Sequence, residues 1–321
     1  MTAPAQREIL VVGSANLDFV VRVPHVPAPG ETVLGCGVKT FPGGKGANQA
    51  VACARAGHAA TGMLLALGDD AYAASIEVSL HQAAVRAAIV RVPGEPTGIA
   101  FVCLADDAEN SITVAPGAND FLRVDHLPPL DRVGHLLLQL ETPLDTVTAC
   151  ALAARAAGVR VVLNAAPARR LPAALLDAVD VLIVNEGELA AITGHGGHSL
   201  ARALALVEVP CVIVTLGARG CLARVHGEVF LQSSFTVDAL DTTAAGDTFC
   251  GVLVAALAQD ETFPEAMRRA SAAAALACTR LGAQASIPIH AEVEAFLFAR
   301  PAHAAVDDRD HDRLAAYCGM T

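Results

Sequence analysis

The stretch at 241–251 reads DTTAAGDTFCG and combines an acidic side chain with small residues at the start of an apolar segment, 252–258. The apolar segment is typical of a helix, and the first N–H groups of a helix have no acceptor within it. Together with the helix dipole, these groups attract anions. Asp247 adds a carboxylate beside the anion site, so the stretch suits phosphoryl transfer to a hydroxyl group with Asp247 as the base. A capped helix without chemistry is the alternative interpretation.

Two further polar stretches lie near the start of the chain. Asn16 and Asp18 follow a buried-strand pattern at 8–13, and an amide next to a carboxylate suits the neighbouring hydroxyls of a polyol, although a turn is the alternative. Residues 41–50 read FPGGKGANQA, in which Lys45 and Asn48 would offer donors to a ligand. This stretch is not a P-loop, because the residue after Lys45 is glycine and carries no hydroxyl group for a metal. A glycine-rich helix start without a ligand remains the alternative.

Polar residues also follow several of the later predicted strands, and the carboxyl ends of parallel strands share one edge of a sheet. We therefore expect these side chains to converge on one site. The polar residues that follow predicted strands are Asn16 and Asp18, Glu141, Asn185 and Glu188, Thr215 and Gly217, and Asp247.

The alternation of strand and helix patterns predicts an α/β fold with a mainly parallel central sheet. Two β-rich segments, at about 15–40 and 97–118, interrupt the alternation and predict a small β-sheet lid. We expect one domain over residues 1–300, followed by a polar tail at 301–321 with weak order.

The composition excludes several classes of protein. A net charge of −11 makes nucleic acid an unsuitable partner. No uninterrupted apolar run reaches the roughly 18 residues of a membrane span, and the first residues lack the pattern of a signal peptide. Nine scattered cysteines without a Cys-x-x-Cys motif fit free thiols, so we expect a cytoplasmic protein.

Taken in order, these motifs resemble those of the ribokinase-like (PfkB) carbohydrate kinases. The resemblance covers about residues 8–300, and two glycine-rich signatures some two hundred residues apart make it specific. It implies a three-layer α/β/α sandwich whose β lid also pairs subunits into a homodimer. It further implies ATP-dependent phosphorylation of the 5-hydroxyl group of D-ribose.

The resemblance assigns the chemistry and the sugar contacts residue by residue. Asp247 would be the catalytic base, beside an anion hole made by the N–H groups of Ala244, Ala245 and Gly246. Ala244 stands where many members of the family have glycine. The implied sugar-binding residues are Asn16, Asp18, Gly44, Lys45, Asn48, Glu141 and Asp247.

The resemblance also assigns the residues that would bind the nucleotide, Mg²⁺ and a monovalent cation. Asn185 and Glu188 match the motif that orders Mg²⁺, its waters and the phosphates. The residues that match nucleotide contacts are Thr215, Gly217, Gly220 and Gly246. A monovalent cation, usually K⁺, would bind largely through main-chain carbonyl groups at Asp241, Thr243, Ala277, Arg280, Gly282 and Ser286.

Three other functions are compatible with parts of this pattern. A deoxyribose or nucleoside kinase of the same family differs by few residue types. A sugar-binding regulator without activity would keep the fold, but the intact Asp247 and anion hole argue against it. A nicotinamide oxidoreductase shares the α/β alternation but needs Gly-x-Gly-x-x-Gly after the first strand, which residues 13–18 lack.

Overall fold

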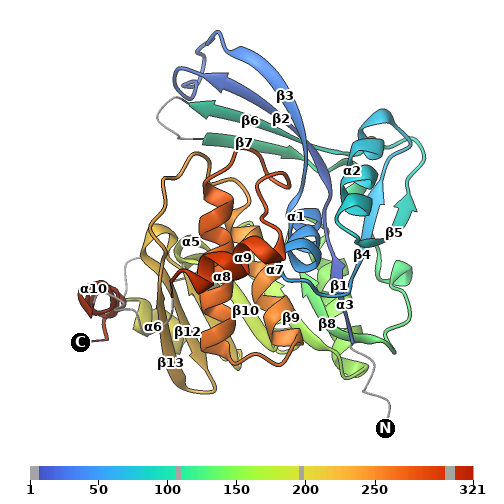
Figure 1. Ribbon diagram of the computed structural model, residues 1–321. Coiled ribbons are helices and arrows are strands. Elements are labelled where there is room, and N and C mark those ends of the chain that lie inside the picture. Colours follow the sequence, from blue (N-terminus) through green and yellow to red (C-terminus); the bar gives the residue numbers. More distant parts are fainter. Residues whose placement is uncertain (1–6, 106–109, 195–198, 301–307, 321) are drawn as a thin grey trace.

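The computed structural model describes residues 7–105, 110–194, 199–300 and 308–320. Within these residues the larger sheet has nine strands in the order β13-β12-β11-β10-β9-β8-β1-β4-β5, parallel except at β12 and β13 (Figure 1). Its strands are β1 (Glu8–Val12), β4 (Thr61–Leu67), β5 (Arg86–Arg91), β8 (Val133–Leu138), β9 (Arg160–Asn164), β10 (Val181–Asn185), β11 (Cys211–Thr215), β12 (Gly220–Val225) and β13 (Glu228–Ser233).

Helices cover both faces of this sheet, which confirms the predicted three-layer α/β/α sandwich. One face carries α1 (Lys45–Val51), a π-helix at Ala52–Ala56, α2 (Ala71–Gln82), α7 (Ala245–Ala258), α8 (Phe263–Cys278) and α9 (His290–Phe298). The other face carries α3 (Leu144–Ala156), α4 (Ala173–Leu176), α5 (Glu186–Thr193), α6 (Leu200–Ala205) and α10 (Asp308–Cys318). Short 3-10 turns lie at Gly117–Phe121, Val124–His126 and Gly217–Arg219.

Burial explains the composition of the central elements. Strands that are covered on both faces need apolar side chains at every position, and every residue of β4 is buried. Helix α7 is buried from Asp247 to Leu257, so small residues are needed where it meets α1. At Gly251 a Cβ atom would lie 2.5 Å from the carbonyl oxygen of Gln49. This close packing places the start of α7 beside the side chains of α1.

The predicted lid is a separate four-stranded sheet in the order β3-β2-β6-β7 (Figure 1). Its strands are β2 (Asn16–Val23), β3 (Cys36–Gly43), β6 (Gly98–Ala105) and β7 (Asn110–Ala115). Asn16 and Asp18 belong to β2, so the alternative interpretation of this segment as a turn was wrong. The chain passes from β1 into β2 within three residues, which puts both side chains at the base of the lid.

The C-terminal segment departs from the weak order expected for residues 301–321. Helix α10 occupies 308–318, and the side chains of Leu314 and Cys318 on it are buried. Residues 301–307 and 321 lie outside the described residues. In the parts of the chain that the structure describes, no helix has the length and apolar character needed to cross a bilayer. All nine cysteines are free thiols.

Candidate active site

Two adjoining cavities lie at the carboxyl ends of the parallel strands. The smaller cavity, of about 300 Å³, is lined by every residue of the predicted sugar set: Asn16, Asp18, Gly44, Lys45, Asn48, Glu141 and Asp247. The larger cavity, of about 880 Å³, is lined by Asn185, Thr215, Gly217, Gly220 and Gly246 of the predicted nucleotide set. Glu188 lines the smaller cavity. The residues common to both cavities are Asn185, Thr215, Thr242 and Gly246.

Asp247 is held by two amide side chains from α1. It lies in the first turn of α7, is 8% exposed, and lines the smaller cavity. Its Oδ2 accepts a hydrogen bond from Nδ2 of Asn48, and its Oδ1 accepts one from Nε2 of Gln49, both at 2.9 Å. Two donors, one on each carboxylate oxygen, fix the plane of the carboxylate. The carboxylate is therefore oriented before any ligand arrives.

Gln49 belongs to a buried amide network that the sequence analysis missed. Its Nε2 also donates to Oδ1 of Asn164 at 3.0 Å, and its Oε1 accepts from Nε2 of Gln139 at 2.6 Å. Gln49 and Gln139 are fully buried. Since a buried amide is costly without partners, this network fixes the rotamer of Gln49 and hence the position of Asp247. The available signal was a polar residue at a helix position that faces the core.

Asn16 and Asn48 present amide groups to the smaller cavity. Oδ1 of Asn16 accepts from Nδ2 of Asn119 at 2.8 Å, and Oδ1 of Asn119 accepts from the N–H of Ala15 at 3.0 Å. Asn119, also missed, therefore orients Asn16 so that its amide donors remain for a ligand. Oδ1 of Asn48 is buried and has no hydrogen-bond partner among the residues that the structure describes. A ligand hydroxyl group in the cavity would satisfy this acceptor.

Glu141 joins the glycine-rich stretch to the sheet. Its Oε2 accepts from Oγ of Ser14 at 2.6 Å and from the N–H of Lys45 at 3.0 Å. Gly44, which precedes Lys45, has φ 88°, and a Cβ atom there would lie 2.7 Å from the backbone nitrogen of Asn16. Only glycine allows this approach, which brings the start of α1 against the start of β2.

The smaller cavity holds several carboxyl groups close to one ammonium group. Burial, together with the charges of Glu141 and Asp247, raises the pKa of Asp18 to about 7, despite the nearby Lys45. Burial alone would lower the pKa of Lys45, but Asp247, Glu141 and Glu188 outweigh it and raise that pKa, so the ammonium group stays charged. Burial raises the pKa of Glu188, and Lys45 opposes this shift. The cavity thus favours added protons or cations.

The start of α7 has the features of an anion site. Ala244 precedes the helix with φ 59°, a left-handed conformation that is unusual for alanine. The N–H of Ala245 donates to the carbonyl oxygen of Thr242 at 3.2 Å, whereas those of Ala244 and Gly246 have no backbone acceptor in the described part of the chain. A Cβ atom added to Gly246 would meet nothing within 4 Å. Open space therefore lies at Gly246, where the two cavities meet.

Asn185 and Glu188 cap helix α5 at the junction of the cavities. Oδ1 of Asn185 accepts from the N–H of Glu188 at 2.8 Å, and Oε2 of Glu188 accepts from the N–H of Asn185 at 2.7 Å. This reciprocal pair leaves Oε1 of Glu188 without a protein donor in the described residues. A carboxylate oxygen that is left free at the cavity fits a hydrated Mg²⁺ ion.

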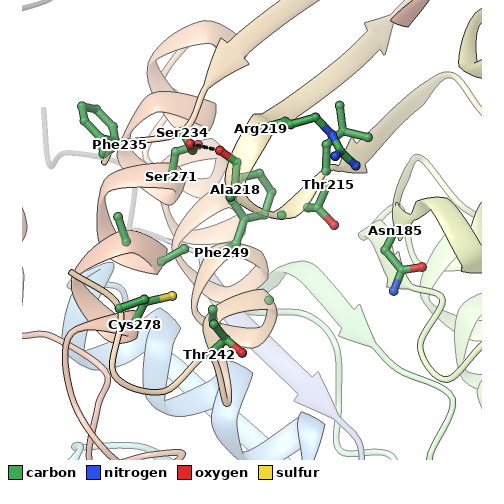
Figure 2. A pocket seen from close by; sticks show the side chains of 18 of the residues that line it. Asn185, Thr215, Ala218, Arg219, Ser234, Phe235, Thr242, Phe249, Ser271 and Cys278 are labelled. Atoms are coloured by element: carbon green, nitrogen blue, oxygen red, sulfur yellow. Dashed lines mark hydrogen bonds between the residues drawn. The ribbon is translucent and has the colours of Figure 1, made fainter. Parts of the chain in front are cut away.

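The larger cavity is lined by both polar and apolar side chains. Figure 2 shows Asn185, Thr215 and Arg219 along one side, whereas Phe249 and Cys278 line it from α7 and α8. Gly220 has φ 115°, and a Cβ atom there would clash with the carbonyl oxygen of Gln232. Glycine at 220 therefore allows the chain to turn back from β11 into β12 beside the cavity.

The residues predicted for a monovalent cation lie in two segments joined by Asp241. Its Oδ1 accepts from the N–H of Thr243 and its Oδ2 from the N–H of Gly282, both at 2.9 Å. The N–H of Arg280 donates to the carbonyl oxygen of Ala277 at 3.2 Å. The Arg280 side chain pairs with Glu292. The hydroxyl group of Ser286 is buried and donates to the carbonyl oxygen of Ala283. Both segments are thus tied to the start of α7.

Comparison with known proteins identifies the family. A model of the pfkB family of carbohydrate kinases matches residues 6–290. The chain belongs to the pfkB carbohydrate kinase family. This membership agrees with the resemblance found in the sequence and with the pair of cavities.

Similar members of the family are described as ribokinases. The ribokinase of Haemophilus influenzae is 39% identical over 303 residues, 91% of this chain and 99% of that protein. The structure of Thermotoga maritima ribokinase gives a TM-score of 0.82 at 36% identity, with 91% and 99% of the two chains covered. Arabidopsis thaliana ribokinase, complexed with ribose and ATP, gives 0.81 at 34% identity, with 91% and 98% covered. These likenesses confirm the ribokinase-like fold.

A relative with a different substrate is also similar. The deoxyribokinase of Salmonella typhi is 33% identical over 293 residues, 88% of this chain and 95% of that protein. Since its identity is close to that of the ribokinases, overall identity does not choose between the two sugars.

Proposed function

We propose that this protein is a ribokinase that transfers the γ-phosphoryl group of ATP to the 5-hydroxyl group of D-ribose. The observation that carries the proposal is the meeting of the two cavities at Gly246, with Asp247 on the side of the smaller one. A sugar-sized polar cavity then adjoins a nucleotide-sized cavity at one helix start. Relatives that align with about 90% of this chain are named ribokinases, which supports ribose as the sugar.

Asp247 would act as the general base. Its carboxylate would accept the proton of the 5-hydroxyl group as that oxygen attacks the γ-phosphorus atom. The bond from the γ-phosphorus atom to the β–γ bridging oxygen breaks, and ADP leaves with the electron pair. The hydrogen bonds from Asn48 and Gln49 keep the carboxylate in place during the transfer.

The start of α7 would stabilise the transferred phosphoryl group. The N–H groups of Ala244, Ala245 and Gly246 and the helix dipole favour negative charge there. The long hydrogen bond from Ala245 to Thr242 would be shared with the anion or replaced by it. Asn185 and Glu188 would hold Mg²⁺, which would neutralise part of the phosphate charge. Thr215, Gly217 and Gly220 would contact the nucleotide.

The polar residues of the smaller cavity would bind the remaining sugar hydroxyl groups. Asn16 and Lys45 offer donors, whereas Asp18, Glu141 and the unpartnered Oδ1 of Asn48 offer acceptors. Strands β2, β6 and β7 of the lid contribute apolar and polar side chains to the same cavity. The lid would exclude water, which is a competing acceptor for the phosphoryl group.

Two further features belong to the proposal. K⁺ bound by the segments that contain Asp241 and 277–286 would order the anion-hole loop without touching the sugar. The lid would also pair two copies of the chain into a homodimer. Both are expectations from the resemblance in sequence, and the hydrogen bonds that Asp241 makes to both cation segments support the first.

An Asp247→Asn variant tests the proposal. Asparagine keeps the shape of the side chain but cannot take the proton, so kcat with ribose should fall by at least about a hundredfold. ADP release would be measured with ribose, deoxyribose and adenosine as acceptors, in K⁺ and in Na⁺. Asp145→Asn, in the exposed first turn of α3, is the matched control and should keep full activity. Full activity of Asp247→Asn would remove Asp247 as the base.

The acceptor panel separates the alternatives. Faster turnover of deoxyribose or adenosine than of ribose would make the protein a deoxyribose or nucleoside kinase of the same family. Binding of ribose without turnover of any acceptor would make it a sugar-binding regulator.

A further inference from the structure

Helix α10 is an addition at the edge of the sheet. It follows the segment that belongs to the family, 6–290. Leu314 and Cys318 lie four residues apart on one face of α10, are 3% and 0% exposed, and join the core on the α3–α6 side. Figure 1 shows α10 beyond β12 and β13, at the end of the sheet opposite to β5. The helix is therefore anchored to the half of the molecule that holds the larger cavity.

Tyr317 on α10 forms a closed triangle with two side chains of the main domain. Its hydroxyl group donates to Oε1 of Glu186 at 2.5 Å and accepts from a guanidinium N–H of Arg219 at 3.0 Å. Arg219 and Glu186 also pair directly, with 2.9 Å between nitrogen and oxygen. The guanidinium carbon lies 4.0 Å from the centroid of the Tyr317 ring. The hydrogen bond to Glu186 raises the pKa of Tyr317, which keeps its hydroxyl group protonated.

Both partners of Tyr317 line the larger cavity. Glu186 begins α5 directly after Asn185, and Arg219 ends the 3-10 turn at Gly217–Arg219. A third cavity, of about 280 Å³, lies between α10 and this turn. The residues that it shares with the larger cavity are Ala218, Arg219, Ser234 and Thr236. The turn is therefore in contact with the larger cavity on one side and with α10 on the other.

We propose that Tyr317 is a positioning residue for the nucleotide: through Arg219 and Glu186 it fixes the wall of the larger cavity formed by the turn at 217–219 and the start of α5. The identity of the ligand rests on the proposed kinase function. Without Tyr317, the half-exposed Arg219 and Glu186 side chains gain rotamer freedom, and the nucleotide has to order them when it binds. Tyr317 lines neither the larger nor the smaller cavity, so ribose binding should not depend on it.

The test compares Tyr317→Phe with the wild-type chain. Phenylalanine keeps the ring under the guanidinium group and removes both hydrogen bonds of the hydroxyl group. Calorimetric titration with the β,γ-imido analogue of ATP and Mg²⁺ should show about three- to tenfold weaker binding. The KM for ATP should rise by the same factor, whereas kcat at saturating ATP and the KM for ribose should stay unchanged.

Tyr72→Phe is the matched control, because Tyr72 is the other tyrosine of the chain and packs against Phe19 of the lid. It should bind the analogue like the wild type. Unchanged analogue binding by Tyr317→Phe overturns the proposal. So does a rise in the KM for ribose that equals the rise for ATP, because α10 would then only support the fold. Analogue binding needs no turnover, so an absence of ribose phosphorylation would refute the proposed function and leave this test intact.

Discussion

At the scale of single residues, the site depends on which carboxyl groups are charged. Asp247 is oriented by two amide donors, whereas Asp18 lies in the same cavity with a pKa raised to about 7 by burial and by the neighbouring carboxylates. With a pKa of about 7, Asp18 is only partly ionised at neutral pH. The sugar hydroxyl groups need acceptors, and Asp18 is an acceptor on both oxygens only when it is ionised.

We predict that ribose binding tightens as the pH rises through the pKa of Asp18. If only the ionised form of Asp18 binds the sugar, the affinity at pH 6 should be about tenfold weaker than at pH 8. The KM for ribose of the wild type would be compared with that of Asp18→Asn, in which this pH dependence should disappear. A wild-type KM that is constant between pH 6 and pH 8 would contradict the assignment.

The raised pKa of Asp18 also predicts how the stability of the ligand-free protein depends on pH. The pKa of Asp18 is raised in the folded state from 3.8 to about 7, so the folded state holds the proton more tightly than the unfolded state does. Below about pH 4, Asp18 is protonated in both states and does not change the free energy of unfolding. Above about pH 7 it is ionised in both states, and it lowers the free energy of unfolding by its full amount. Thermal unfolding should therefore show Asp18→Asn gaining stability over the wild type as the pH rises across this window. Equal profiles would count against the raised pKa.

At the scale of elements, the start of α7 joins the two halves of the site. Gly251 lets α7 pack against α1, and that packing carries Asp247 to Asn48 and Gln49. The left-handed residue Ala244 directly precedes α7, and Gly246 in the first turn of the helix lines both cavities. The helix thus contributes through its backbone as well as through one carboxylate.

We predict that Gly246→Ala lowers the activity without lowering the thermal stability. The added methyl group meets no protein atom within 4 Å and would occupy the space proposed for the phosphoryl group. The rate of ribose phosphorylation should fall by at least about tenfold, because misplacement of the reacting groups is costly. Alanine is a better helix former than glycine by up to about 1 kcal/mol, so the thermal midpoint should stay the same or rise. A loss of activity that follows a loss of stability would argue against an anion site at Gly246.

The elements that the sequence predicts well are those whose signal is local. Apolar runs predict β1, β4, β8, β10 and β11, and polar residues after strands locate the site, because parallel strands share an edge. Gln49, Asn119 and Gln139 were missed, because their partners in the site lie 90 to 198 residues away in the sequence and only the fold brings them together. Helix α10 was missed because its apolar stripe, Leu314 with Cys318, is narrow among many charged residues.

At the scale of the whole molecule, the lid has two different faces. Directly paired residues of neighbouring strands share a face, and the faces alternate along each strand. Asp18, Ala100 and Val114 are paired across the sheet and point to the smaller cavity, and Ile112, two residues before Val114, lies on the same face. Ile112 is 52% exposed in the single chain. This exposed apolar face fits the proposed pairing of two lids.

We predict that Ile112→Lys shifts the protein from dimer to monomer. A lysine ammonium group buried between two lids would lose its hydration without gaining a partner, which weakens association. Val38→Lys is the matched control: Val38 is also β-branched, is 61% exposed, and pairs with Val21 on the opposite face of the same sheet. Sedimentation equilibrium should therefore give the dimer mass for the wild type and for Val38→Lys, and the monomer mass for Ile112→Lys. A dimer that survives Ile112→Lys but not Val38→Lys would place the interface on the outer face, and the lid would then pair away from the sugar cavity.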